Sequence, residues 1–134
     1  MNAAGPNVPR PVRAAGMLVV LQGLVGVAAG GWLLIAAVRG STGPVPIGAT
    51  AAWFLGFGVI LLAVGVNLVR GRHGARTPAI VAQLLLLGAC WYATGPSSRP
   101  AYGVPAGAFC VAVLVLLFCA SARRWAADAH SARR

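Results

Sequence analysis

The spacing of arginine residues is the feature that most constrains this fold, because it divides 134 residues into long uncharged stretches. The four stretches are 14–38, 40–69, 77–98 and 100–122. A helix of about 20 apolar residues crosses a hydrocarbon core of about 30 Å, and each stretch is long enough to do so. We therefore predict an all-α membrane protein with four transmembrane helices. Their expected bounds are about 15–38, 47–69, 78–95 and 103–122.

The composition agrees with this class. Only 9% of the residues are charged, 59% are hydrophobic and the mean hydropathy is +0.82, whereas soluble domains carry about 25% charged residues. The formal charge of +10 comes from eleven arginines and one acid, Asp128. These arginines separate apolar segments and form no continuous basic surface, so they argue against nucleic-acid binding. They favour orientation in a membrane and contact with anionic lipid head groups.

The beginning of the chain has an alternative interpretation as a signal peptide. Arg10 and Arg13 precede the apolar run MLVVLQGLVGVAAGG, as in the charged and apolar regions of such peptides. Signal-peptide apolar regions extend for about 7–15 residues, but this run continues through Trp32 and Ile35. Three further apolar stretches follow. We therefore expect an uncleaved first helix.

The arginines also predict the orientation of the chain, because short basic segments stay in the cytoplasm. With four crossings, nine of the eleven arginines fall on the side of both termini. We expect a cytoplasmic N-tail (1–13), a transmembrane domain (14–122) and a cytoplasmic basic C-tail (123–134). The arginines expected to set topology or to contact lipid head groups include Arg70, Arg72, Arg76, Arg123 and Arg124. Whether segment 70–77 is a topology signal alone or also binds anionic lipid or an acidic partner stays open.

Three amide side chains lie within the predicted spans, in the cytoplasmic half of the bilayer. They are Gln22, Asn67 and Gln83. Amides in membrane helices usually form hydrogen bonds to a neighbouring helix, at about 0.6–2 kcal/mol each. We expect interhelical polar contacts from these three residues; a polar lining for a substrate path is the alternative.

Small residues mark the faces on which we expect the helices to pack. On the first helix these are Gly16, Gly23, Gly26 and Gly30. On the second we expect the same role for Ala52, Gly56 and Ala63. The pattern does not say whether the partner helix belongs to the same chain or to a second copy.

A weak internal repeat is visible. The second and fourth spans are entered through VPIGA (45–49) and VPAGA (104–108), and the order Arg, Gln, Trp occurs before each. One interpretation is a duplicated αα-hairpin. The other is the abundance of Gly, Ala, Val and Pro in this chain.

The residues that membrane chemistry requires are largely missing from the sequence. Proton-coupled transport needs a titratable carboxylate within the membrane, and Asp128 lies in the predicted C-tail. This argues against a small multidrug exporter, although the length would suit one. His73 and His130 are far apart and show no metal-ligand spacing. We expect no catalytic residues, no metal site and no cofactor.

The three cysteines, Cys90, Cys110 and Cys119, fall in the third and fourth spans. Buried cysteine behaves as a small apolar residue, which is the role we expect. A disulfide between Cys90 and Cys110 is conceivable, because both lie in the outer half of the bilayer.

Three segments resemble a group of small actinobacterial four-helix membrane proteins of uncharacterised function. They are VRAAGMLVVLQGLVGV, VNLVRGRHGARTPAIVAQLLLL and VLVLLFCASARR. The resemblance implies a four-helix fold in the bacterial plasma (inner) membrane. It implies no activity and no site residues.

Two functions fit the sequence. The first is a non-enzymatic integral membrane protein, structural or accessory to a larger membrane complex, whose partners are the bilayer, other membrane proteins or a second copy. The second is a small oligomeric channel or transporter without a proton-coupling carboxylate. Because the polar groups crowd one half of the spans, no continuous hydrated path is evident. The first function is therefore favoured.

Overall fold

The computed structural model describes residues 8–40, 46–95, 100–119, 123–124, 127–128 and 131. In this part of the chain the secondary structure is entirely helical. The helices are α1 (Arg10–Val38), α2 (Ile47–Val69), a short 3-10 helix η1 (His73–Ala75), α3 (Arg76–Thr94) and α4 (Pro100–Phe118). The all-helical fold with four α-helices is therefore confirmed.

The helix bounds differ from the expected spans in α1, α3 and α4, and α3 covers 76–94 where 78–95 was expected. The bounds of α2 agree, whereas α1 begins five residues earlier than expected and includes Arg10 and Arg13. Hydropathy marks only the apolar part of a helix, which can continue beyond it through polar residues, and arginine is a good helix former. Helix α4 begins at Pro100, three residues before the expected start, because proline is favoured in the first turn of a helix. It ends at Phe118, and Cys119 after it is a bend. The remaining residues of the expected fourth span, 120–122, lie outside the described residues.

Helices α1 and α2 both end at the sequence Val-Arg-Gly. The glycines Gly40 and Gly71 each have φ +76°, which is the left-handed conformation that commonly terminates a helix. After α2, the N–H of Gly71 donates to Leu68 O at 3.1 Å and that of Arg72 to Asn67 O at 2.9 Å. This pair of bonds reverses the chain, so that α3 begins within a few residues of the end of α2.

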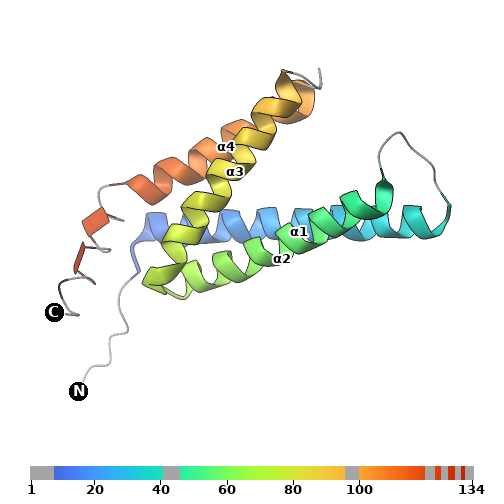
Figure 1. The fold of residues 1–134 in the computed structure, drawn as a ribbon. Coiled ribbons are helices and arrows are strands. Elements are labelled where there is room, and N and C mark those ends of the chain that lie inside the picture. Colours follow the sequence, from blue (N-terminus) through green and yellow to red (C-terminus); the bar gives the residue numbers. More distant parts are fainter. Residues whose placement is uncertain are drawn as a thin grey trace.

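The four helices form two antiparallel hairpins (Figure 1). Helices α1 and α2 form hairpin one, and α3 and α4 form hairpin two. The hairpins meet at the end where α1 begins and α4 ends, which we call the shared end, and they diverge towards the other, far end. The first residue of α1 and the last residue of α4 therefore lie on the same side of the molecule.

The buried core lies at the shared end, where both hairpins contribute to it. Its fully buried side chains include Val12, Val19, Leu68, Val113 and Leu117. Large apolar side chains are exposed along the helices at both ends, for example Met17 at 57% near the shared end and Trp32 at 73% and Trp91 at 79% towards the far end. One end of the molecule therefore holds the two hairpins together.

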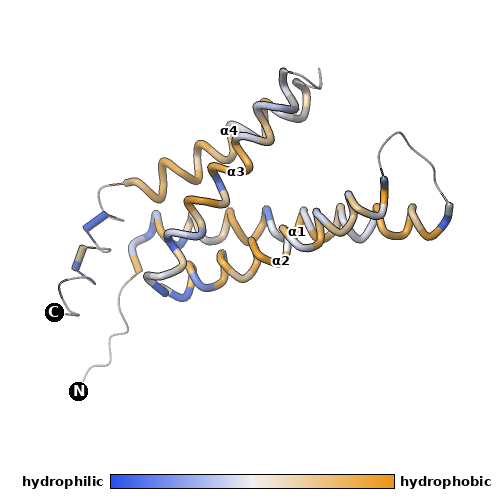
Figure 2. The backbone as a smooth tube through the Cα atoms, in the orientation of Figure 1, coloured by the Kyte–Doolittle hydropathy of each residue, from blue (hydrophilic) through white to orange (hydrophobic). Residues whose placement is uncertain are grey.

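Two of the described helices, α1 and α2, are long and apolar enough to cross a membrane. The apolar part of α4, Gly103–Phe118, is shorter. In a soluble protein such helices would be mostly buried, but only 17% of the apolar window of α1 and 28% of that of α2 are buried. Apolar residues continue along both hairpins, and hydrophilic ones gather around the shared end (Figure 2). This pattern favours association with a membrane.

Candidate functional site

The glycines of α1 lie directly against the backbone of α2. Gly16, Gly23 and Gly30 are buried, and a Cβ atom on any of them would lie 2.7–3.0 Å from a backbone nitrogen of α2. A Cβ atom on Gly26 would lie 3.2 Å from Gly58 Cα. These distances leave no room for a side chain, so the glycines let two helix backbones approach closely, as in membrane helix pairs.

The opposing face of α2 consists of Ala51, Gly58 and Gly65, which also recur at heptad spacing. Because the hairpin is antiparallel, its carbonyl groups meet the α1 glycines in reverse order. A Cβ atom on Gly16, Gly23 or Gly30 would lie 3.2, 2.9 or 3.1 Å, respectively, from the carbonyl oxygen of Gly65, Gly58 or Ala51. We call these six residues the glycine interface.

The small residues expected to pack on the second helix lie on a different face of it. Ala52, Gly56 and Ala63 are exposed, and a Cβ atom on Gly56 would find nothing within 4 Å. Successive residues of an α-helix are rotated by about 100°, so Ala52 points well away from its neighbour Ala51. Several small-residue stripes occur on α2, and only one of them faces α1.

A polar junction connects the two hairpins at the border of the core. Gln83 Nε2 donates to Gln22 Oε1 at 2.7 Å, and Gln22 Nε2 donates to Cys110 Sγ at 3.6 Å. Gln83 is fully buried. The three residues belong to α3, α1 and α4, so this polar junction joins both helices of hairpin two to hairpin one.

The oxygen of Gln83 and the amide of Asn67 do not take part in hydrogen bonds between the described helices. Gln83 Oε1 is buried and has no hydrogen-bond partner among the described residues. Asn67 Nδ2 donates to Ala63 O at 2.8 Å, within its own helix. The structure thus brings Gln22 and Gln83 together and leaves Asn67 outside the polar junction.

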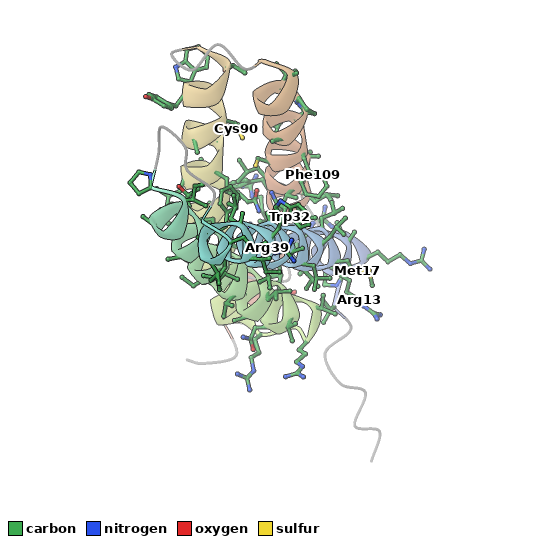
Figure 3. The ribbon with its side chains drawn as sticks, turned by 90° about the vertical axis from the view of Figure 1, so that its right-hand side faces the viewer. Arg13, Met17, Trp32, Arg39, Cys90 and Phe109 are labelled. Atoms are coloured by element: carbon green, nitrogen blue, oxygen red, sulfur yellow. The ribbon has the colours of Figure 1, made fainter. Side chains whose placement is uncertain are left out.

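The polar junction also includes a pair of thiols. Cys110 is buried, Cys90 is half-buried, and their side chains interact across the contact of α4 with α3. Figure 3 shows Cys90 in the space between the two helices of hairpin two. No disulfide joins Cys90 and Cys110 in the structure.

Arg76, the first residue of α3, bonds to the end of α4. Its Nη2 donates to Leu117 O at 2.8 Å, and its guanidinium carbon lies 6.0 Å from the centroid of the Phe118 ring. The carbonyl groups at a helix C-terminus carry partial negative charge, so a cation is favourable there. Arg76 Nε is buried without a hydrogen-bond partner in the described part of the chain.

The remaining predicted head-group or topology arginines are on the surface. Arg70, Arg72, Arg123 and Arg124 are exposed, as is Asp128. Arg70 and Arg72 follow directly after α2, at the shared end. Within residues 8–40, 46–95, 100–119 and the short described parts of the tail, no group of three or more His, Cys, Asp or Glu could hold a metal ion. His130 lies outside the described residues, and the side chain of His73 is also outside them.

Sequence reasoning missed two parts of this arrangement. The α2 face of the glycine interface carries a signal, because Ala51, Gly58 and Gly65 recur every seven residues as the α1 glycines do. The bond between Arg76 and Leu117 has no signal in the sequence, since the two residues are 41 positions apart.

Comparisons of the chain with protein-family models, with curated proteins and with solved structures give no match.

Proposed function

We propose that this chain is a four-pass protein of the bacterial plasma membrane, structural or accessory to a larger membrane complex. Helices of 29, 23, 19 and 19 residues measure about 43, 34, 28 and 28 Å at 1.5 Å per residue. The first two lengths exceed the hydrocarbon thickness of about 30 Å, and the last two are close to it. The resemblance to small actinobacterial four-helix membrane proteins supports the same location.

In this proposal both termini are cytoplasmic and the shared end faces the cytoplasm. The support is the arginine distribution, since Arg10, Arg13, Arg70 and Arg72 all lie at the shared end. Single cysteines introduced at Ser41, His73, Ser97 and Ser131 in a cysteine-free background test it with a membrane-impermeant thiol reagent. We expect labelling from outside intact cells at Ser41→Cys and Ser97→Cys only. External labelling of His73→Cys would contradict the topology.

The observation that carries an accessory role is the divergence of the two hairpins. Among the described residues, faces of both hairpins remain uncovered, and on α2 such a face carries Gly48, Ala52 and Gly56, all exposed. Small residues at four-residue spacing allow close packing of another membrane helix. Gln22 and Gln83 meanwhile bond to one another across the polar junction, and Asn67 bonds within α2, which argues against a continuous polar path.

Affinity purification in a mild detergent tests the role. We expect one partner at a fixed stoichiometry, lost when Gly56→Leu blocks the exposed face of α2. Gly31→Leu is the matched control, because Gly31 of α1 also has open space around a Cβ atom. A partner retained equally by both variants would contradict a docking face on α2.

The channel or transporter alternative rests on a cleft of about 290 Å³ beside Gln22, with Pro105 and Phe109 among its other walls. Its test uses the purified chain alone in lipid vesicles. A homo-oligomer that makes such vesicles permeable to ions or small solutes, and that loses this permeability with Gln22→Leu, would replace the accessory proposal.

A further inference from the structure

A groove of about 670 Å³ lies between the last turns of α2 and the first turn of α3, at the shared end. Ligand sites are commonly about 300–1,000 Å³. We call this space the α2–α3 groove and define it by the residues that carry its chemistry: Ala63, Val64, Asn67, Arg72, Gly74 and Pro78.

The α2–α3 groove has an apolar part and a polar part. Ala63, Val64 and Pro78 supply hydrocarbon along two neighbouring helices, whereas Arg72 and Asn67 supply a guanidinium and an amide. Arg72 is exposed and follows the last turn of α2. A ligand with a charged head and an apolar tail matches this division, and a free ion would use only the polar part.

The charge balance of the chain determines the sign of that head. The sequence has eleven arginines and a single acid, Asp128, so most guanidinium groups have no carboxylate of the same chain to neutralise them. Arg70, also exposed, lies two residues from Arg72 and adds to the positive potential. The head is therefore an anion from outside the chain.

Asn67 adds a preference for one kind of anionic head. Its Nδ2 donates one of its two hydrogens to Ala63 O, and its amide oxygen is an acceptor that can take a hydrogen bond from a ligand. A head group with hydroxyl donors next to its phosphate satisfies both Asn67 and Arg72.

We propose that the α2–α3 groove binds one anionic phospholipid of the inner leaflet whose head carries hydroxyl groups, such as phosphatidylglycerol. The phosphate bonds to Arg72, a head-group hydroxyl donates to Asn67, and an acyl chain lies along Ala63, Val64 and Pro78. This inference rests on the proposed membrane topology, which places the shared end at the cytoplasmic surface.

The test measures binding of phosphatidylglycerol and of phosphatidylcholine to the full-length chain by native mass spectrometry from detergent micelles. We expect the chain to retain phosphatidylglycerol preferentially. Arg72→Gln should weaken its retention about fivefold, since a basic residue near an anionic lipid contributes about that factor. Arg13→Gln is the matched control, because it removes an equal charge at the shared end from a residue that does not line the α2–α3 groove.

Two further measurements test the apolar part of the groove and distinguish a lipid from free phosphate. Ala63→Phe, which fills the apolar part, should reduce lipid retention. Inorganic phosphate should not compete at millimolar concentrations. Competition by phosphate together with an unaffected Ala63→Phe variant would show an anion site and overturn the proposal. Equal losses of phosphatidylglycerol retention in Arg72→Gln and Arg13→Gln would overturn the proposal as well, because they would show that the lipid is attracted by the overall positive charge and not by this groove.

Failure of this site is distinguishable from failure of the proposed function. If the chain inserts into vesicles with its termini on one side but shows no lipid preference, the lipid site is wrong and the topology stands. If the chain does not insert, the topology fails and the lipid site fails with it.

Discussion

Hairpin one and hairpin two have the same antiparallel topology but differ in how closely their helices approach. In hairpin one the glycine interface brings the backbones of α1 and α2 together at three successive heptad positions. Of the described glycines in hairpin two, only Gly103 is as crowded, since a Cβ atom there would lie 2.8 Å from Cys90 O, whereas one on Gly107 would find its nearest atom at 3.7 Å. Close packing is continuous in hairpin one and local in hairpin two.

This difference indicates how a chain with few polar groups can still have a defined architecture. Membrane helices gain little from apolar burial against one another, so close packing and hydrogen bonds decide their association. Hairpin one is held together by close packing along its length. Hairpin two is bonded to hairpin one through the polar junction, which provides hydrogen bonds between the hairpins. The bond from Arg76 to Leu117 O joins α3 to α4 within hairpin two.

The largest expected effect comes from breaking the glycine interface at its centre. In Gly23→Leu the added side chain meets Leu62 N at 2.7 Å and Gly58 O at 2.9 Å, so α1 and α2 must separate. Overpacking of this kind costs about 3 kcal/mol, and we expect such a loss in reversible unfolding by sodium dodecyl sulfate titration. Gly31→Leu, which has open space at the same helix, should unfold nearly like the parent chain. Similar losses in both variants would contradict the glycine interface.

A smaller effect is expected at the polar junction. Gln83→Leu removes the donor to Gln22 Oε1, and interhelical hydrogen bonds in membranes contribute about 1 kcal/mol. A double-mutant cycle with Gln22→Leu measures the coupling in the same titration. Strictly additive losses would mean that the two amides do not interact. Asn67→Leu serves as a comparison, because that amide bonds within α2.

The smallest effect is expected at the end of α4. Arg76→Gln removes the cation beside Leu117 O, and a charge at a helix C-terminus contributes about 0.5 kcal/mol. Faster amide hydrogen exchange in the last turn of α4, with hairpin one unchanged, is the expected observation. Arg124→Gln removes a charge from an exposed position. If it produced the same change, the effect would be one of net charge.

Much of hairpin geometry could be predicted from the sequence, but the relation between the hairpins could not. The bounds of α2 follow from hydropathy, and the common depth of Gln22 and Gln83 follows from their positions in parallel helices. The α2 contact face is ambiguous in the sequence: Ala51, Gly58 and Gly65 recur every seven residues, but the stripe that contains Ala52 is made of equally small residues. The divergence of the two hairpins does not follow either. A helix that is apolar on every side has no sequence pattern that marks which part of it contacts another helix.

The central claim is that hairpin two meets hairpin one at the shared end and diverges from it at the far end. Paired spin labels in lipid nanodiscs test it most directly, in a variant without the native cysteines. One pair replaces Met17 and Val115 near the shared end, and the other replaces Trp32 and Trp91 near the far end, all four being exposed. The structure predicts a longer distance for the far-end pair by double electron–electron resonance. Equally short distances for both pairs would show that the hairpins lie side by side along their whole length, which would contradict the claim.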